Sequence, residues 1–169
     1  MKLTKCPNGH FYDADNIRRV ISVIVLNEDS VLSRISGLFS ARGYNIDSLT
    51  VAPIPDSEYS RITIVTNGSS RVINQIIKQL NKLIPVLKVN EHKDMIEKDT
   101  VLIKLPIEEH LSDIDVLARC YNGHIQNVTE NAIVVAATDD PARIANFIKV
   151  MQRFKPLEIV RSGVVAIER

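Results

Sequence analysis

The sequence predicts an α+β fold built from two modules, each of which runs β-α-β-β-α-β. Isoleucine and valine total 40 residues against 13 leucines, and such an excess of β-branched side chains favours sheet. Strand-like apolar runs alternate with stretches in which apolar residues recur at helical spacing. This order occurs once before and once after the polar stretch EHKDMIEKD, which predicts two modules rather than one.

The first module begins with a near-continuous apolar run, typical of a strand buried on both faces. A turn-forming segment, NEDS, then precedes a helical stripe that Gly43 ends, and Ser69 or Ser70 caps a second helix that Pro85 ends. In chain order, the predicted elements are strand Val20–Leu26, helix Val31–Arg42, strands Asn45–Ile54 and Arg61–Thr66, a second helix up to Pro85, and strand Val86–Val89. This is the order of the split, ferredoxin-like βαββαβ unit.

The second module repeats that order more loosely. Its second helix starts at Asp140-Pro141, an N-cap residue followed by proline at the first helical position. The predicted elements are strand Thr100–Leu105, a helix with its stripe from Leu111 to Tyr121, a hairpin of Ile125–Thr129 and Ala132–Ala137, a helix after Pro141, and strand Val164–Ile167. We therefore predict a flexible extension over residues 1–17, modules over 18–92 and 100–169, and a linker over 93–99.

Composition limits the function classes. Lys and Arg total 21 against 20 Asp and Glu among 169 residues, so no general basic field favours nucleic acid. No apolar run approaches the roughly 18 residues of a membrane span, and the first residues lack the apolar core of a signal peptide. Two cysteines suit a reducing compartment. We expect a cytoplasmic protein with neither a membrane nor a nucleic-acid partner.

Familiar catalytic motifs are absent from the sequence. The six glycines lie too far apart for a phosphate-binding loop or a dinucleotide fingerprint, and neither G-x-S-x-G nor H-E-x-x-H occurs. These absences favour a binding or regulatory role. A small enzyme that uses Asp and Glu residues outside known motifs remains an alternative.

The turn at residues 27–32 is the most suggestive candidate site. A helix N-terminus presents unpaired N–H groups that attract a carboxylate, and the side chain of Asn27 offers an oxygen to an ammonium group. Asn45, which follows the helix, is expected to come close, so that a free amino acid would fit between the two. The alternative is that Asp29 or Ser30 merely caps the helix, and the pattern alone favours that interpretation.

Two segments resemble a known family. Arg18–Thr66, with its block LSRISGLFSARGYNIDSLTV, is similar to the ACT domain of the small regulatory subunits of acetolactate synthase, also called acetohydroxyacid synthase. Glu158–Arg169, EIVRSGVVAIER, resembles the ending of the same family. The likeness runs in order from Arg18 to Arg169.

The resemblance implies an N-terminal ACT domain, a C-terminal ferredoxin-like domain and a homodimer that pairs through its ACT domains. It also implies a large catalytic subunit as partner, which carries thiamine diphosphate, magnesium and FAD and joins a fragment of pyruvate to a second 2-oxoacid. The small subunit is then non-catalytic and without cofactors. It activates the large subunit and senses valine for feedback inhibition in branched-chain amino acid biosynthesis. A stand-alone ACT-domain sensor of another target is the alternative.

By resemblance, valine binds at the first helix, between two ACT domains. The matching positions are Asn27, Asp29, Ser30, Val31 and Leu32 of one chain, with Asn45 and Ile46 on the facing wall. An apolar pocket distinguishes one methylene weakly, so some response to leucine or isoleucine is expected. Ser30 departs from the usual glycine. It either crowds the ligand, at a cost of about 1 kcal/mol if its φ is positive, or caps the helix and leaves binding intact.

The pattern C-x-N-G-H occurs twice, at Cys6–His10 and Cys120–His124. Two thiolates and two imidazoles would make a tetrahedral zinc set. The spacing within each copy is unusual for paired zinc ligands, and the second copy also reads as a helix stop before a strand. We therefore expect no metal site.

Overall fold

The computed structural model describes residues 3–5, 11–13, 17–107 and 111–169. The chain divides into two compact units, one of residues up to Met95 together with Ala166–Arg169, the other of Ile96–Val165. Within the part predicted as a flexible extension, strands β1 (Leu3–Lys5) and β2 (Phe11–Asp13) pair antiparallel. None of the described helices is long and apolar enough to cross a lipid bilayer.

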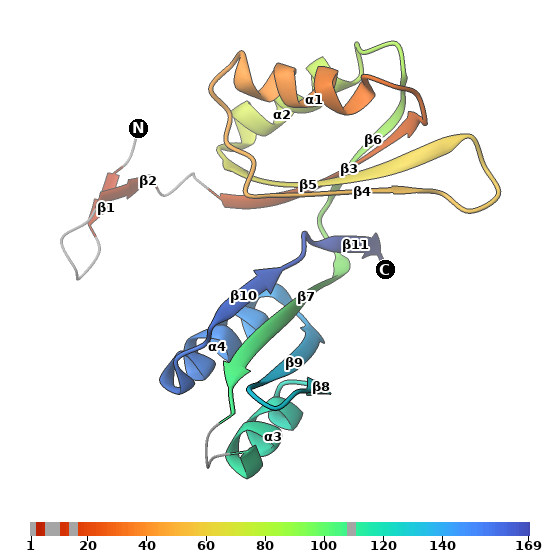
Figure 1. Cartoon of the computed structure of the whole chain (residues 1–169). Coiled ribbons are helices and arrows are strands. Elements are labelled where there is room, and N and C mark those ends of the chain that lie inside the picture. Colours follow the sequence, from red (N-terminus) through yellow and green to blue (C-terminus); the bar gives the residue numbers. More distant parts are fainter. Residues whose placement is uncertain (1–2, 6–10, 14–16, 108–110) are drawn as a thin grey trace. The chain divides into compact units, whose positions relative to one another are not determined.

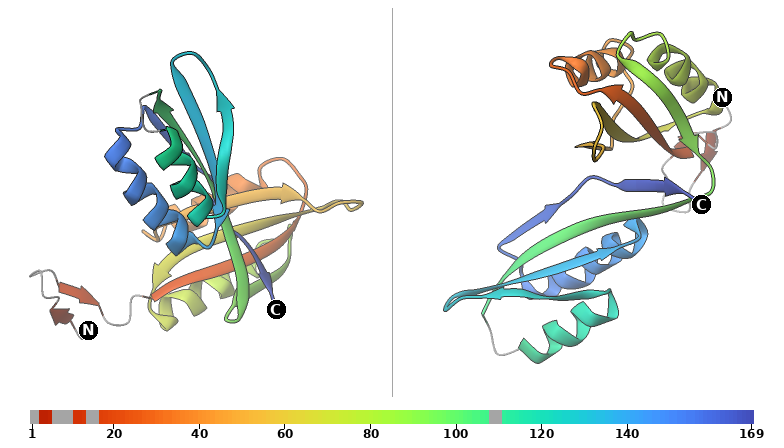
Figure 2. Two further views of the ribbon diagram at one scale, coloured as in Figure 1. Left: turned by 90° about the horizontal axis from the view of Figure 1, so that it is seen from below. Right: turned by 90° about the vertical axis from the view of Figure 1, so that its right-hand side faces the viewer.

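The first unit is the predicted βαββαβ fold. Its elements are β3 (Ile17–Leu26), α1 (Val31–Ser40), β4 (Ser48–Pro53), β5 (Tyr59–Gly68), α2 (Ser70–Leu80) and β6 (Val86–His92). The strands form an antiparallel sheet in the order β4-β5-β3-β6, so the first strand of the fold is central. Both helices cover the same face of this sheet (Figures 1 and 2).

The core of this unit fills the space between the sheet and the helices. Alternate residues of β3 point toward the helices, which matches the two-residue period of a strand. The central buried side chains are Ile21, Val23 and Val25 of β3, Ile35 and Phe39 of α1, and Ile73, Ile76 and Leu80 of α2. Ser69 caps α2 by accepting a hydrogen bond from the N–H of Val72, which confirms one of the two predicted caps.

The second unit repeats the architecture. Its elements are β7 (Met95–Pro106), α3 (Leu111–Cys120), β8 (Gly123–Val128), β9 (Ala132–Asp139), α4 (Pro141–Met151), a 3-10 turn at Gln152–Phe154 and β10 (Glu158–Arg161). The last strand, β11 (Val165–Glu168), groups for the most part with the first unit. The sheet order is β10-β7-β9-β8, and β11 also pairs with β7. A second core, which includes Ile103, Ile133 and Phe147, joins this sheet to its helices.

Two boundaries differ from the sequence prediction. The expected linker over residues 93–99 is a bend followed at Met95 by the first residues of β7, whose alternating burial continues into the apolar part of that strand. The strand beside β7 that completes the βαββαβ order is β10, not the predicted Val164–Ile167, which corresponds to β11. Two apolar residues between Glu158 and Arg161 are too few for a period-two pattern to predict a strand.

A buried carboxylate joins three elements of the second unit. Asp139, at the end of β9, accepts hydrogen bonds from Lys98 on β7, Asn122 after α3 and Arg143 on α4. The Lys98 ammonium lowers the pKa of Asp139 well below its ordinary value, and the N–H of Asp140 and the Arg143 side chain add to this against the effect of burial. The charged form of Asp139 therefore stabilises the fold.

Replacing this carboxylate by its amide is expected to destabilise the second unit. Asp139→Asn removes the negative charge of a buried side chain that accepts from two half-exposed cations, so the free energy of unfolding at pH 7 should fall by roughly 1.5–3 kcal/mol. Because the pKa is lowered on folding, the carboxylate contributes fully above its unfolded value of 3.8 and loses its contribution as the pH falls below that value. Urea unfolding should therefore show the gap between the two proteins closing in acid.

Asp140→Asn is the matched control. Asp140 pairs with the same Lys98, but its side chain is 57% exposed, so the loss should stay below about 1 kcal/mol. Equal losses for the two variants at pH 7 would contradict the role assigned to Asp139.

Candidate functional site

The predicted site lies where β3 ends and α1 begins. Between them stand four exposed residues, Asn27 to Ser30. Their backbone is tied to two neighbouring segments, because the N–H of Leu26 donates to the carbonyl of Pro85 at 2.9 Å and that of Asn27 to Glu58 at 2.8 Å. The entrance to the helix is thus held in place from both sides.

The N-terminus of α1 carries no side-chain cap. Ser30 occupies the N-cap position without a side-chain hydrogen bond, and the first turn has no acidic residue. The first helical bond runs from the N–H of Arg34 to the carbonyl of Ser30 at 3.0 Å, so the preceding N–H groups have no acceptor within the helix. This arrangement leaves the positive end of the helix dipole open to a carboxylate.

Two apolar residues flank this opening in different ways. Val31 is buried, 4% exposed, and belongs to the core of the unit, whereas Leu32 is 43% exposed. Val31 therefore fixes the helix start against the sheet. Leu32 leaves an apolar side chain at the surface beside the free N–H groups.

The sequence left two alternatives for Ser30, a strained residue with positive φ or a helix cap, and the structure shows the first. Its φ is 71° and its ψ −7°, in the left-handed region, where a side chain costs about 1–2 kcal/mol. The expectation that Ser30 caps the helix is wrong, because its hydroxyl makes no cap bond. Glycine would meet the same backbone requirement without a Cβ.

Asn45 and Ile46 lie far from this opening within one chain. The carbonyl of Asn45 accepts a hydrogen bond from the hydroxyl of Thr66 on β5. Thr66 lies opposite Arg19 of β3, and Arg19 is seven residues before the last residue of that strand, Leu26. At the rise of a strand, that separation is about 20 Å. The expectation that Asn45 approaches the helix start is therefore wrong for a single chain, because α1 runs back along the sheet and carries the chain to its other end.

The side chains at this second place are exposed or half-buried. Asn45 is exposed and donates to Asp47 at 2.6 Å, while Ile46 packs against the edge of the first core. The predicted site residues thus form two separate groups, one at each end of β3.

The second Cys–His motif does not form a metal centre with its neighbours. Cys120 is an exposed free cysteine, and His124 contacts Gln126 at 2.8 Å through Nε2. Asn122 has a φ of 55°, which agrees with a helix stop. No group of three metal-ligating side chains occurs in the described part of the chain, and Cys6 and His10 lie outside it.

Known proteins share both units. Residues 21–88 match the model of the ACT domain of acetohydroxyacid synthase small subunits, and residues 98–169 match that of the small subunit of acetolactate synthase. The isozyme 3 small subunit of acetolactate synthase from Escherichia coli is 39% identical over 157 residues, covering 90% of this chain and 96% of its own. The chain belongs to the family of acetolactate synthase small subunits.

Other members of the family are similar along nearly the same length. The small subunit from Buchnera aphidicola of Schizaphis graminum is 38% identical, covering 90% of this chain and 99% of its own. The crystal structure of the small subunit from Thermotoga maritima superposes with a TM-score of 0.85 at 30% identity, over 90% of this chain and 98% of that one. The expected family and the two-module α+β fold are confirmed, including the ACT domain as the first module.

Replacing Ser30 by glycine should stabilise the protein. Ser30→Gly removes a Cβ from a residue at φ 71° without removing a hydrogen bond, so the free energy of unfolding should rise by about 1 kcal/mol. Chemical denaturation measures the change. Ser33→Gly, inside the same helix, is the control and should lower the stability by a few tenths to 1 kcal/mol. A loss of stability in Ser30→Gly would contradict the strained conformation.

Proposed function

We propose that this chain is the non-catalytic regulatory subunit of an acetolactate synthase, that it binds and activates the large catalytic subunit, and that it senses valine. The relatives named as small subunits over almost the whole chain support the partner. The uncapped start of α1 carries the proposal for the ligand, because it offers free N–H groups beside an exposed apolar side chain.

The chemistry of this place suits a branched amino acid. The N–H groups of Val31 and Leu32 would receive the carboxylate, as helix N-termini do. The side-chain oxygen of Asn27 is available to an ammonium group, and Leu32 offers an apolar contact to an aliphatic side chain. Leucine and isoleucine should also bind, with a free energy of binding within about 1–3 kcal/mol of that of valine, because an apolar pocket distinguishes one methylene only weakly.

A second copy of the chain would complete the site. Asn45 and Ile46 lie about 20 Å from the helix start in their own chain, so they serve this ligand only from a partner protomer. A ligand held between two protomers favours the paired state, and its effect on the catalyst is limited by its differential affinity for the states it links.

The proposal assigns the chemistry of the reaction to the partner. Thiamine diphosphate, magnesium and FAD belong to the large subunit, and this chain contributes binding and regulation alone. The small subunit and its partner are proposed to work in the cytoplasm.

The direct test is co-purification with a large subunit and an assay of acetolactate formation. The complex should form more acetolactate than the large subunit alone, and valine should reduce that rate. Asn27→Ala should keep the activation and lose most of the valine response, because it removes one proposed ligand contact. A chain that binds valine and leaves the large subunit unaffected would instead indicate a stand-alone sensor.

Mixing two variants tests whether the site is shared between chains. Asn27→Ala and Asn45→Ala homodimers should each bind valine poorly. After unfolding and refolding together, half of the dimers carry both variants and each holds one intact site, so calorimetry should recover about one site in four.

Refolding each variant alone is the control and should recover none. If the mixture binds no more valine than the separate variants, the shared site is wrong. If Asn45→Ala alone binds as tightly as the unmodified protein, Asn45 is not part of the site.

A further inference from the structure

A second place with the chemistry of a binding site lies on the sheet of the first unit, on the face opposite its helices. Ser22 and Ile24 of β3 point to this face, because the residues between and beside them fill the helix-covered core. The strand register places Asn90 of β6 beside Ser22, and Arg61 of β5 and Lys88 of β6 on either side of Ile24. Polar and cationic side chains from three strands therefore converge.

A buried histidine at this face has an unused nitrogen. His92, at the end of β6, is 6% exposed, and its Nε2 lies 2.8 Å from the hydroxyl oxygen of Ser22. Its Nδ1 is buried and has no hydrogen-bond partner among the residues that the structure describes. Buried polar atoms are almost always paired, so such an orphan atom indicates a missing partner.

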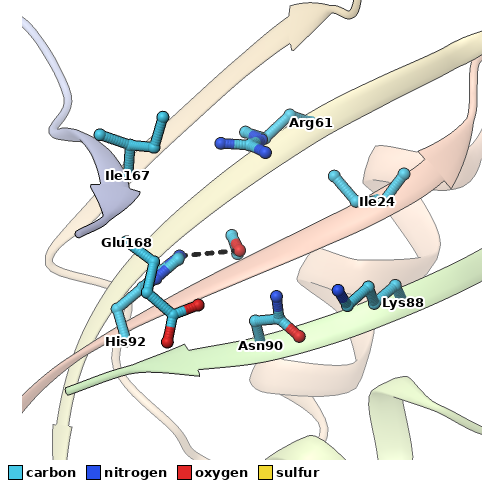
Figure 3. A pocket seen from close by; sticks show the side chains of 8 residues that line it. Ile24, Arg61, Lys88, Asn90, His92, Ile167 and Glu168 are labelled. Carbon is cyan, nitrogen blue, oxygen red and sulfur yellow. Dashed lines mark hydrogen bonds between the residues drawn. The ribbon is translucent and has the colours of Figure 1, made fainter. Parts of the chain in front are cut away.

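The orphan nitrogen belongs to a residue that lines a cavity of about 150 Å³. The lining residues are Ser22, Ile24, Arg61, Lys88, Asn90, His92, Ile167 and Glu168. The last two come from the C-terminal segment, which groups with the first unit. Figure 3 shows the side chains of Arg61, Lys88 and Asn90 standing on the same face of the sheet as the bond between His92 and Ser22.

The charged groups of this cavity form no ion pair with one another or with other residues in the described part of the chain. Neither Arg61 nor Lys88 forms an ion pair within 4.0 Å with any residue that the structure describes, and the same holds for Glu168. Two cations and one carboxylate leave a net positive lining, which favours a ligand with one negative charge. Arginine and lysine are the usual partners of carboxylates and phosphates.

The uncharged lining narrows the class of ligand. Ile24 lies between the two cations and Ile167 lines the same cavity, so part of the ligand contacts aliphatic carbon. The side-chain amide of Asn90, which lines the same cavity, can bond a further polar group of the ligand. We propose that this cavity binds a small organic carboxylate that carries an oxo or hydroxyl group next to its carboxylate.

In this complex, the carboxylate lies against Arg61 and Lys88, and the neighbouring oxygen accepts from the side-chain amide of Asn90. The carboxylate of Glu168 disfavours a ligand with two negative charges. This site is separate from the helix start and does not depend on the proposed valine site.

Nuclear magnetic resonance of the full-length protein with labelled histidine tests the site, with pyruvate as the probe. Pyruvate should shift the ring nitrogens of His92 saturably, while its uncharged amide, pyruvamide, should bind at least tenfold more weakly. This comparison needs no variant. A shift that fails to saturate, or equal binding of the two probes, would overturn the proposal.

A pair of double variants tests the residues. Arg61→Gln with Lys88→Gln should weaken pyruvate binding by at least about tenfold. Arg71→Gln with Lys78→Gln removes the same charge from exposed positions on α2 and should leave binding unchanged. Equal weakening in both pairs would indicate a general charge effect and contradict the site.

Two further probes separate other ligand classes. If inorganic phosphate binds more tightly than pyruvate, the cavity is a site for phosphate and not for organic carboxylates, which contradicts the proposal. Magnesium that shifts His92 at concentrations where pyruvate does not would assign the orphan nitrogen to a metal, which also contradicts it. Asn27→Ala should bind pyruvate as the unmodified protein does, which separates this result from any failure at the helix start.

Discussion

The central position of β3 determines where chemistry can occur in the first unit. This strand pairs with β5 over its whole length and with β6 from Val20 to Val25, and both of its faces carry buried side chains. Its C-terminal end delivers the chain to the start of α1. Its length then keeps the segment after α1 about 20 Å away from that start. In a single chain, the two groups of proposed ligand residues therefore lie at opposite ends of the strand.

This separation gives a physical reason why the proposed site would need two copies of the chain. An uncapped helix N-terminus attracts a carboxylate but supplies only one wall, and an amino acid needs contacts for its ammonium group and side chain as well. If those contacts come from a second protomer, ligand binding and subunit pairing become linked, which is what regulation of a separate catalyst requires. Ser30 adds a local strain at the same point, because its backbone adopts a positive φ.

Much of this fold could be predicted from the sequence, because its elements follow simple periods. The run from Val20 to Leu26 and the stripes of α1 and α2 gave the order and approximate bounds of the first unit. β10 was not predicted, because charged residues stand on both sides of its two apolar positions. The start of β7 was not predicted, because it lies in a charged stretch. The alternation of buried and exposed side chains becomes clear only in the apolar part of the strand that follows.

The candidate site shows the same limit. The position of the helix start follows from local sequence, whereas its uncapped state does not, because the pattern favoured a cap by Asp29 or Ser30. The position of Asn45 depends on the reversal of the chain by α1. The conformation of Ser30 was one of two alternatives that spacing does not separate. The cavity beside His92 was not predicted at all, because its lining comes from three strands and the C-terminal segment, and a lone histidine at a strand end carries no sequence signal.

The most direct test of this account is a crystal structure of the protein with valine bound. It should place the valine carboxylate within hydrogen-bond distance of the N–H groups at Val31 and Leu32 of one protomer, with Asn45 of the second protomer on the opposite side. Valine that contacts residues of one chain alone, or that lies elsewhere on the molecule, would contradict the shared site.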